Sequence, residues 1–221
     1  MPTFEENRAA LDNRNLVRKV QKVILVLAPT TVDLPTSLYT TGGTLIDLKT
    51  AGWLPVGMMT PDGVTYGGER EVQTVDAFGY ASAVRSDVVK VPRTITFTPL
   101  EKGRKHLYEL RLGADLTGVT QDPTTGEIVI DEPELPVDQE YRLLALGSDG
   151  PADENWIMGR GYGRVKLANS GEEVWGGDGA VASQLTLNVF TDDEIGVPVR
   201  HYLGGTGAVK HKAELGFTAG A

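Results

Sequence analysis

Cysteine is absent from this chain of 221 residues. Its absence excludes disulfide bonds and thiolate metal sites, and it leaves the redox compartment undefined. Basic residues are outnumbered as well: 21 lysines and arginines stand against 30 aspartates and glutamates, giving a formal net charge of -9. Such a chain repels a phosphate backbone, so we do not expect sequence-specific binding of nucleic acid.

Long apolar runs are also missing. The longest, from Val23 to Ala28, is far shorter than the roughly 20 residues that cross a bilayer, and it predicts a buried strand. The segment from Met1 to Asn7 lacks the basic and apolar regions of a signal peptide, so we expect synthesis in a cytoplasm and no membrane partner. Hydrophobic residues still make up 40% of the chain, which is enough to bury a core.

The known motifs of catalysis and metal binding do not occur. His106, His201 and His211 lie far apart in the sequence, without the spacing of a zinc site. Residues 159–163 are rich in glycine but lack the spacing of a phosphate-binding loop, and no nucleophile elbow is found. Residues 192–194 are acidic, yet an ordinary turn explains them better than a calcium loop. We therefore expect no enzyme, no metal and no cofactor.

Extended segments dominate the pattern. The clearest is 184–190, where Leu185, Leu187 and Val189 alternate with Gln184, Thr186 and Asn188, as a strand with one buried face requires. Further strands are predicted at 16–27, 69–77, 94–98, 127–131, 141–147 and 164–168. Turns are predicted at 62–63, 122–126 and 148–151 from their Gly, Pro and Asp residues.

One well-capped helix is predicted at about 98–112. Thr98, Pro99 and Glu101 form a capping-box pattern, and Gly113 is a natural terminator. Its leucines, Leu100, Leu107 and Leu110, share one stripe, so the helix is expected to cover a sheet. The predicted fold class is therefore mainly β, a β-sandwich or rolled sheet with one amphipathic helix.

The chain is predicted to form a single domain over residues 1–205. Residues 1–15 are expected to be an N-terminal arm that orders against a neighbour. A long loop over about 30–52 separates the first strand from the rest, and loops of this length in compact domains are usually functional or disordered. Residues 206–221 have few apolar anchors and predict a flexible C-terminal tail.

Several short segments, taken in order, resemble a known family. They are Asn15-Leu16-Val17-Arg18, the strand ending at Ala28-Pro29 with its Pro- and Thr-rich loop, Gly52-Trp53-Leu54-Pro55-Val56-Gly57, Asp62-Gly63-Val64, residues 75–79, 84–86 and 95–101, and the closing segment 199–205. In this order they resemble the major tail tube proteins of long-tailed bacteriophages, particularly those that infect actinobacteria. The resemblance covers about residues 15–205, apart from a middle region, 113–155, that is longer than the family pattern.

The resemblance implies a structural virion protein located in the phage tail. Its protomers would form hexameric rings that stack into a hollow tube for delivery of the genome into the host. The implied partners are other copies of the chain, the tape measure protein, and the tail-tip and terminator proteins. Double-stranded DNA would pass through the tube without being bound in a sequence-specific way.

Particular residues follow from this hypothesis. Glu69, Glu71 and Asp76 are candidates for the lumen, because carboxylates repel DNA. Candidates for contacts between rings lie in the long loop: Asp33, Leu34, Leu38, Tyr39, Leu45 and Ile46. Deleting residues 33–48 is expected to leave a folded protomer that cannot stack. Structural positions similar to those of the family are Trp53, Gly57, Asp62, Gly63 and Val64.

Other classes of function remain open. A carbohydrate-binding β-sandwich could use Trp53, Trp156 or Trp175, although tryptophans in β proteins more often pack in cores or interfaces. An enzyme with dispersed carboxylates is supported by no motif. A tail-completion or capsid-decoration protein is the nearest alternative, and it would form a cap, a lattice or a single ring instead of an open-ended stack.

Overall fold

In the computed structural model the chain is mainly β, with antiparallel sheets. The structure describes all residues except 138, 178 and 219–221. The described elements are α1 (Phe4–Leu11), the 3-10 turn η1 (Arg14–Leu16), β1 (Lys22–Pro29), β2 (Leu54–Pro55), β3 (Met59–Gly67), β4 (Glu71–Val75), β5 (Arg85–Lys90), β6 (Thr94–Pro99), α2 (Lys105–Leu112), β7 (Tyr141–Asp149), the 3-10 turn η2 (Ala152–Glu154), β8 (Trp156–Ser170), β9 (Leu185–Phe190), β10 (Arg200–Gly204) and α3 (Thr206–Lys210).

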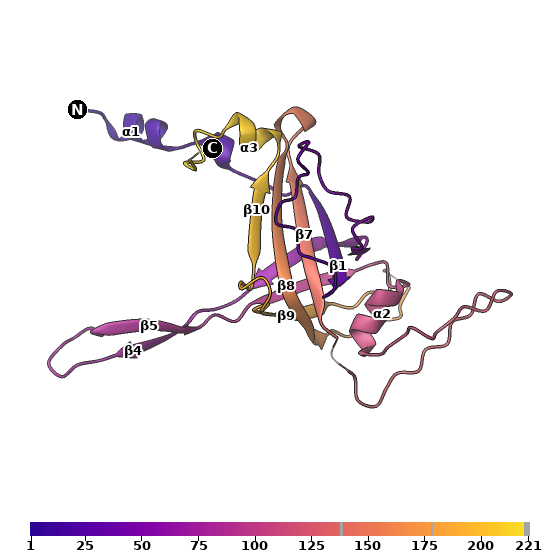
Figure 1. The fold of residues 1–221 in the computed structure, drawn as a ribbon. Helices are drawn as coiled ribbons and strands as arrows, with labels where there is room; N and C mark the ends of the chain where they lie inside the picture. Colours follow the sequence, from indigo (N-terminus) through magenta and orange to yellow (C-terminus); the bar gives the residue numbers. More distant parts are fainter. Residues whose placement is uncertain (138, 178, 219–221) are drawn as a thin grey trace.

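The main sheet has eight strands and branches at β8 (Figure 1). Its main path runs β2-β1-β7-β8-β9-β6-β3. The long strand β8 pairs with β7 over most of its length, while its other edge is shared: residues 157–161 pair with β10 and residues 164–170 pair with β9. The sheet therefore divides at β8 into two branches, one that ends in β10 and one that continues through β9, β6 and β3. A groove lies between the two branches.

The inner core lies on one face of the main sheet. Five successive strands, β1, β7, β8, β9 and β6, contribute to a single buried cluster. Helix α2 covers this cluster with Leu107 and Leu110. Members of the cluster include Leu25, Leu27, Leu143, Val165, Ile95, Phe97, Leu185 and Leu187. The expected alternation in 184–190 is confirmed, since Leu185 and Leu187 are buried and Asn188 is exposed.

A second core lies on the opposite face of β1 and β7. Val26 and Ala28 of β1 point away from the inner core and pack with Leu144 and Leu146 of β7. The loop over residues 30–52, here called the covering loop, closes this cluster together with Trp53. The run from Val23 to Ala28 is thus apolar without alternation because residues 25–28 are covered on both faces.

The predicted helix at 98–112 begins later than expected. Residues 94–99 form β6, between β3 and β9, and α2 starts only at Lys105. The Glu101 carboxylate accepts a hydrogen bond from Met58 N at 2.8 Å instead of completing a capping box. Pairing in the sheet therefore overrides the local capping signal. Its end is confirmed, because Gly113 is the C-cap with φ of 58°.

Other sequence predictions have mixed outcomes. Strands at 94–98, 141–147 and 164–168 are confirmed, and the one at 69–77 is shortened to β4. The first strand starts at Lys22, not at residue 16, because 14–16 form a 3-10 turn. The strand at 127–131 is wrong: the turn at 122–126 forms, but its flanks pair with no strand in the described chain. The pair Asp62-Gly63 lies in a bulge of β3 rather than in a hairpin turn.

Candidate assembly surfaces

A hairpin formed by β4, β5 and the tip residues 76–84 projects away from the main sheet (Figure 1). Every residue of its two strands is exposed. The tip carries Phe78, which is fully exposed, and Tyr80, which is 72% exposed. An isolated two-stranded hairpin is at best marginally stable in water. Exposed aromatic residues at the end of such a projecting hairpin make this tip a candidate contact surface.

A groove of about 920 Å³ lies between the two branches of the sheet. Its walls come from β3 on one side and from β7, β8 and β10 on the other, and apolar side chains such as Met58 and Leu203 reach its opening. In the described chain β3 pairs only with β6 and β10 only with β8, so each leaves one edge open. A chain segment entering the groove would meet unpaired backbone groups as well as apolar side chains.

Tyr66 and Arg160 are among the residues that line this groove. The Arg160 guanidinium lies 4.0 Å from the centroid of the Tyr66 ring, and behind the lining the ring of Tyr66 is stacked on buried Tyr162 with centroids 6.3 Å apart. Burial, with a smaller effect from Tyr162, raises the pKa of Tyr66 to about 12. This tyrosine is therefore neutral at physiological pH, and the lining here keeps the single positive charge of Arg160.

The N-terminal arm contains a helix without a tertiary partner. In α1 the Thr3 hydroxyl and the Glu6 carboxylate form a capping box, yet no residue of the helix is buried. Phe4 and Leu11 are each more than three-quarters exposed. A helix of eight residues is marginal by itself, and no side chain of α1 is buried against the rest of the described chain.

An acidic excursion leaves the body between α2 and β7 (Figure 1). From residue 112 to 141 the chain has eight aspartates and glutamates and no lysine or arginine. Nearly the whole net charge of -9 therefore comes from this segment. The sequence analysis does not identify this acidic segment, although the absence of lysine and arginine from it is a signal that could have done so. Its charge makes it a surface that repels phosphate.

The predicted ring-contact residues divide into two groups. Leu34 and Leu38 are buried in the second core, with Tyr39 packed beside them, so these side chains serve their own protomer. Asp33 and Leu45 are exposed, while Ile46 is half-buried. The burial of Leu34 and Leu38 argues against the expectation that deleting 33–48 leaves the protomer folded, because the deletion would uncover Val26, Leu144 and their neighbours in the second core.

The lumen candidates are all exposed on the projecting hairpin. Glu71 opens β4, Glu69 precedes it and Asp76 follows it. The register shift between Glu71 and Val72 breaks the regular alternation assumed for these carboxylates. The structure brings them together on one ribbon, and their position in a lumen stays a prediction.

Two of the positions similar to the family are glycines with contrasting surroundings. Gly57 has φ of 87°, and a Cβ there would lie 2.3 Å from the Glu101 carboxyl carbon. Gly63 has φ of 67° and open space around it. Of the other three, Trp53 is buried in the second core, Val64 packs against the inner core and Asp62 is exposed.

The two glycines make a matched pair of variants. Gly63→Ala is expected to cost about 1 to 2 kcal/mol of unfolding free energy, because it forces alanine into the left-handed region. Gly57→Ala should cost more, since it also displaces Glu101 from the Met58 amide. Urea unfolding of both variants measures the difference. Equal losses would show that the contact between Glu101 and Met58 contributes nothing measurable.

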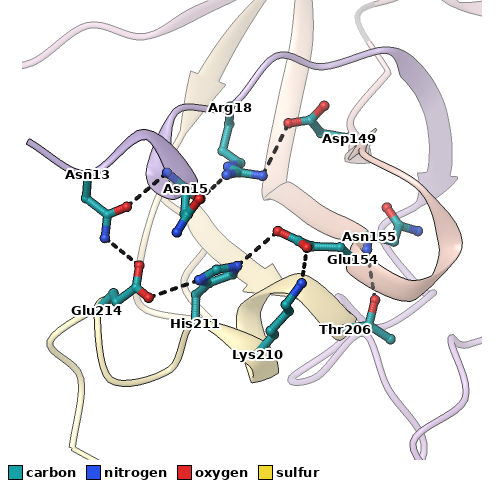
Figure 2. Close-up of polar contacts among 10 residues, drawn as sticks. All are labelled: Asn13, Asn15, Arg18, Asp149, Glu154, Asn155, Thr206, Lys210, His211 and Glu214. Atoms are coloured by element: carbon teal, nitrogen blue, oxygen red, sulfur yellow. Dashed lines mark hydrogen bonds and ion pairs between the residues drawn. The ribbon is translucent and has the colours of Figure 1, made fainter.

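A polar cluster joins the two ends of the chain to the β7–β8 turn (Figure 2). We call it the terminal junction, and it comprises residues 13–18, 149–156 and 206–215. His211 lies between two carboxylates, with Nε2 2.9 Å from Glu154 Oε1 and Nδ1 3.1 Å from Glu214 Oε1. Asn13 donates a hydrogen bond to Glu214, which connects the base of the N-terminal arm to the same group.

Trp156 forms the apolar centre of the terminal junction. The imidazole of His211 is stacked on its ring with centroids 6.0 Å apart, and the Arg18 guanidinium lies 4.3 Å from the ring centroid. Arg18 also pairs with Asp149 at 3.6 Å. Helix α3 is held closely, because a Cβ on Gly207 would lie 2.2 Å from the indole nitrogen. Residues 206–215 thus differ from the expected loose tail, while residues 219–221 lie outside the described chain.

The tryptophans also bear on the carbohydrate hypothesis. Trp53 and Trp156 are at most 3% exposed and occupy cores, so neither offers a ring face to a sugar. Trp175 is 84% exposed and donates a hydrogen bond to Glu173 at 2.6 Å. A single exposed indole does not make a sugar-binding platform.

Searches of the described residues found no metal-binding group of three or more His, Asp or Glu side chains. Among the same residues, each helix is too short or too polar to span a bilayer. The chain matches no protein-family model and no curated protein.

Proposed function

We propose that this chain is a structural protein that assembles with copies of itself, as hexameric rings stacked into the tail tube of a long-tailed bacteriophage. The main observation in favour of self-assembly is the projecting hairpin, whose strands are wholly exposed and whose tip presents Phe78 and Tyr80. The resemblance of residues 15–205 to major tail tube proteins supplies the rings, the tube and the virion location.

The other surfaces support the same proposal. The groove, with its open strand edges, could bind a segment of a neighbouring copy. The hairpin and α1 are candidates for that segment, because neither is buried in its own protomer. When the donor and the receptor belong to the same chain, the contact is heterologous, and repeating it generates rings or open-ended stacks. The acidic excursion, together with Glu69, Glu71 and Asp76, would discourage DNA from adhering to the assembly.

The partners follow from the proposed role. Neighbouring copies are the principal ones, and a tube of this kind would also contact a tape measure protein, tail-tip proteins and a terminator protein. Double-stranded DNA would pass through without specific binding. These assignments rest on the resemblance to the family.

Negative-stain electron microscopy across a concentration series tests this proposal. We expect rings at low concentration and hollow tubes of constant width at high concentration. A matched sample lacking residues 70–89, with a short Gly-Ser link in their place, should stay monomeric with an unchanged core. A full-length protein that stays monomeric throughout would contradict the proposal, and closed caps or flat lattices would favour a tail-completion or decoration protein.

A further inference from the structure

The terminal junction contains a histidine whose two ring nitrogens both face carboxylate oxygens (Figure 2). A carboxylate only accepts hydrogen bonds, so both ring nitrogens must donate. Neutral imidazole has one N–H, whereas imidazolium has two. The arrangement around His211 therefore fits the protonated ring, and the neutral ring would turn a lone pair toward Glu154 or Glu214.

The charges around His211 reinforce this requirement. Four carboxylates face it or its immediate neighbours: Glu214 after α3, Glu154 and Asp153 in η2, and Asp149 at the end of β7. The cations of the terminal junction are Lys210, paired with Glu154, Arg18, paired with Asp149, and Arg14 and Lys212. Loss of the His211 proton removes the positive charge that lies between Glu154 and Glu214.

Little else fastens the two terminal segments. Residues 13–18 include no buried side chain, and in residues 206–215 only Gly207 and His211 are buried. Helix α3 has five residues, too few to be stable without its contacts. The polar contacts of the terminal junction therefore hold these segments in place. Some of them do not involve His211: Asn155 N donates to Thr206 Oγ1 at 2.8 Å, Gly207 N donates to the Asn155 carbonyl at 3.0 Å, and Arg18 pairs with Asp149. The contacts of His211 add to these.

From this geometry we propose that His211 is a proton-dependent clamp: protonated, it ties the C-terminal segment and the base of the N-terminal arm to the β7–β8 turn, and deprotonated, it loosens both. The clamp is a property of the single chain and does not rest on the proposed assembly. It gives the protomer a means to free its arm without unfolding its core.

The direction of the pH dependence follows from the surroundings. The carboxylates of Glu214 and then Glu154 raise the pKa of His211 above 6.5. A group whose pKa is raised in the closed form stabilises that form fully below its open-form pKa of about 6.5, and this stabilisation is lost as the pH rises through the closed-form value. The segments should therefore be closed in mild acid and open in mild alkali.

Two measurements on the full chain test the clamp. NMR gives the pKa of His211, which is assigned by comparison with His211→Gln. Hydrogen exchange at about pH 6 and pH 8.5, expressed as protection factors, reports the opening of residues 13–18 and 206–215. Protection should fall at the higher pH, by at most a factor of ten raised to the difference between the measured pKa and about 6.5, while protection in β7 and β8 stays unchanged.

Variants separate the clamp from a general effect of pH. His211→Gln should abolish the pH dependence in both segments, and His201→Gln, at an exposed histidine of β10, should preserve it. If His211→Gln does not fold, Glu214→Gln serves instead and should lower the pKa of His211 and weaken protection of residues 13–18 at both pH values. Equal wild-type protection at the two pH values, or a pH dependence that persists undiminished in His211→Gln or in Glu214→Gln, would overturn the proposal.

Discussion

Replacing Arg142 with methionine is expected to lower the free energy of unfolding by about 3 to 5 kcal/mol, the cost of removing one partner from a buried ion pair. Arg142 lies on β7 with its side chain 3% exposed. It donates to the Val32 carbonyl at 2.9 Å and pairs with Asp192 at 3.6 Å and Glu194 at 2.5 Å. Without it, the buried carboxylate of Asp192 loses its ion pair.

The loss should be structural as well as energetic. Val32 begins the covering loop, and Asp192 caps the turn after β9 by accepting from the amides of Glu194 and Ile195. Arg142 therefore fixes both segments to the same point of β7, over the second core. We expect hydrogen exchange in the covering loop to accelerate more than exchange in β9.

A matched variant shows whether burial is the reason. Glu194→Gln removes a partner that is 69% exposed, and exposed pairs contribute only about 0 to 1 kcal/mol. Urea unfolding with equal m values gives both losses directly. If Glu194→Gln costs as much as Arg142→Met, the ion pair with the exposed residue, not the buried one, holds the loop.

Local signals in the sequence predicted those elements whose structure is decided locally. The end of α2 at Gly113 depends on one residue that adopts a positive φ readily, and the alternation in β9 depends on one covered face. The predicted start of α2 is wrong because residues 94–99 pair with two neighbouring strands, β3 and β9. No pattern within the segment itself indicates this pairing.

The prediction for the covering loop fails for a related reason. The loop has no regular apolar pattern, which favours its interpretation as a surface free to contact a neighbouring ring. Yet the continuous apolar run of β1 implied that both faces of this strand are buried, and something had to cover the second face. Leu34 and Leu38 are that cover. Combining the two observations would have assigned the loop to the core.

The sequence indicates part of the hairpin but does not indicate the terminal junction. Only the first strand of the hairpin was predicted, within 69–77, and β5 was not. The isolation of the hairpin from the sheet depends on the arrangement of the whole fold. The terminal junction joins Asn13 to Glu214, 201 positions apart, and neither residue carries a local signal. Such a cluster is found only when the chain ends are placed in space.

Two phenylalanines offer the sharpest separation of folding from assembly. Phe97 of β6 is 2% exposed, pairs in register with Leu185 and belongs to the inner core. Phe97→Ala should therefore cost about 3 to 5 kcal/mol of unfolding free energy through lost burial and a residual cavity. Phe78, at the hairpin tip, is fully exposed in the protomer. Phe78→Ala should change protomer stability by less than about 0.5 kcal/mol.

The same pair should behave in the opposite way in assembly. If the hairpin tip docks into a neighbouring copy, Phe78→Ala loses an aromatic anchor, and tubes should disappear at concentrations where the unaltered protein forms them. Phe97→Ala, assayed well below its lowered melting temperature, should still assemble because its surface is unchanged. Sedimentation of tubes beside thermal unfolding of the protomer provides both readouts. If Phe78→Ala forms tubes as readily as the unaltered protein, the hairpin tip makes no contact that assembly needs, and the open strand edges around the groove must supply the contact instead.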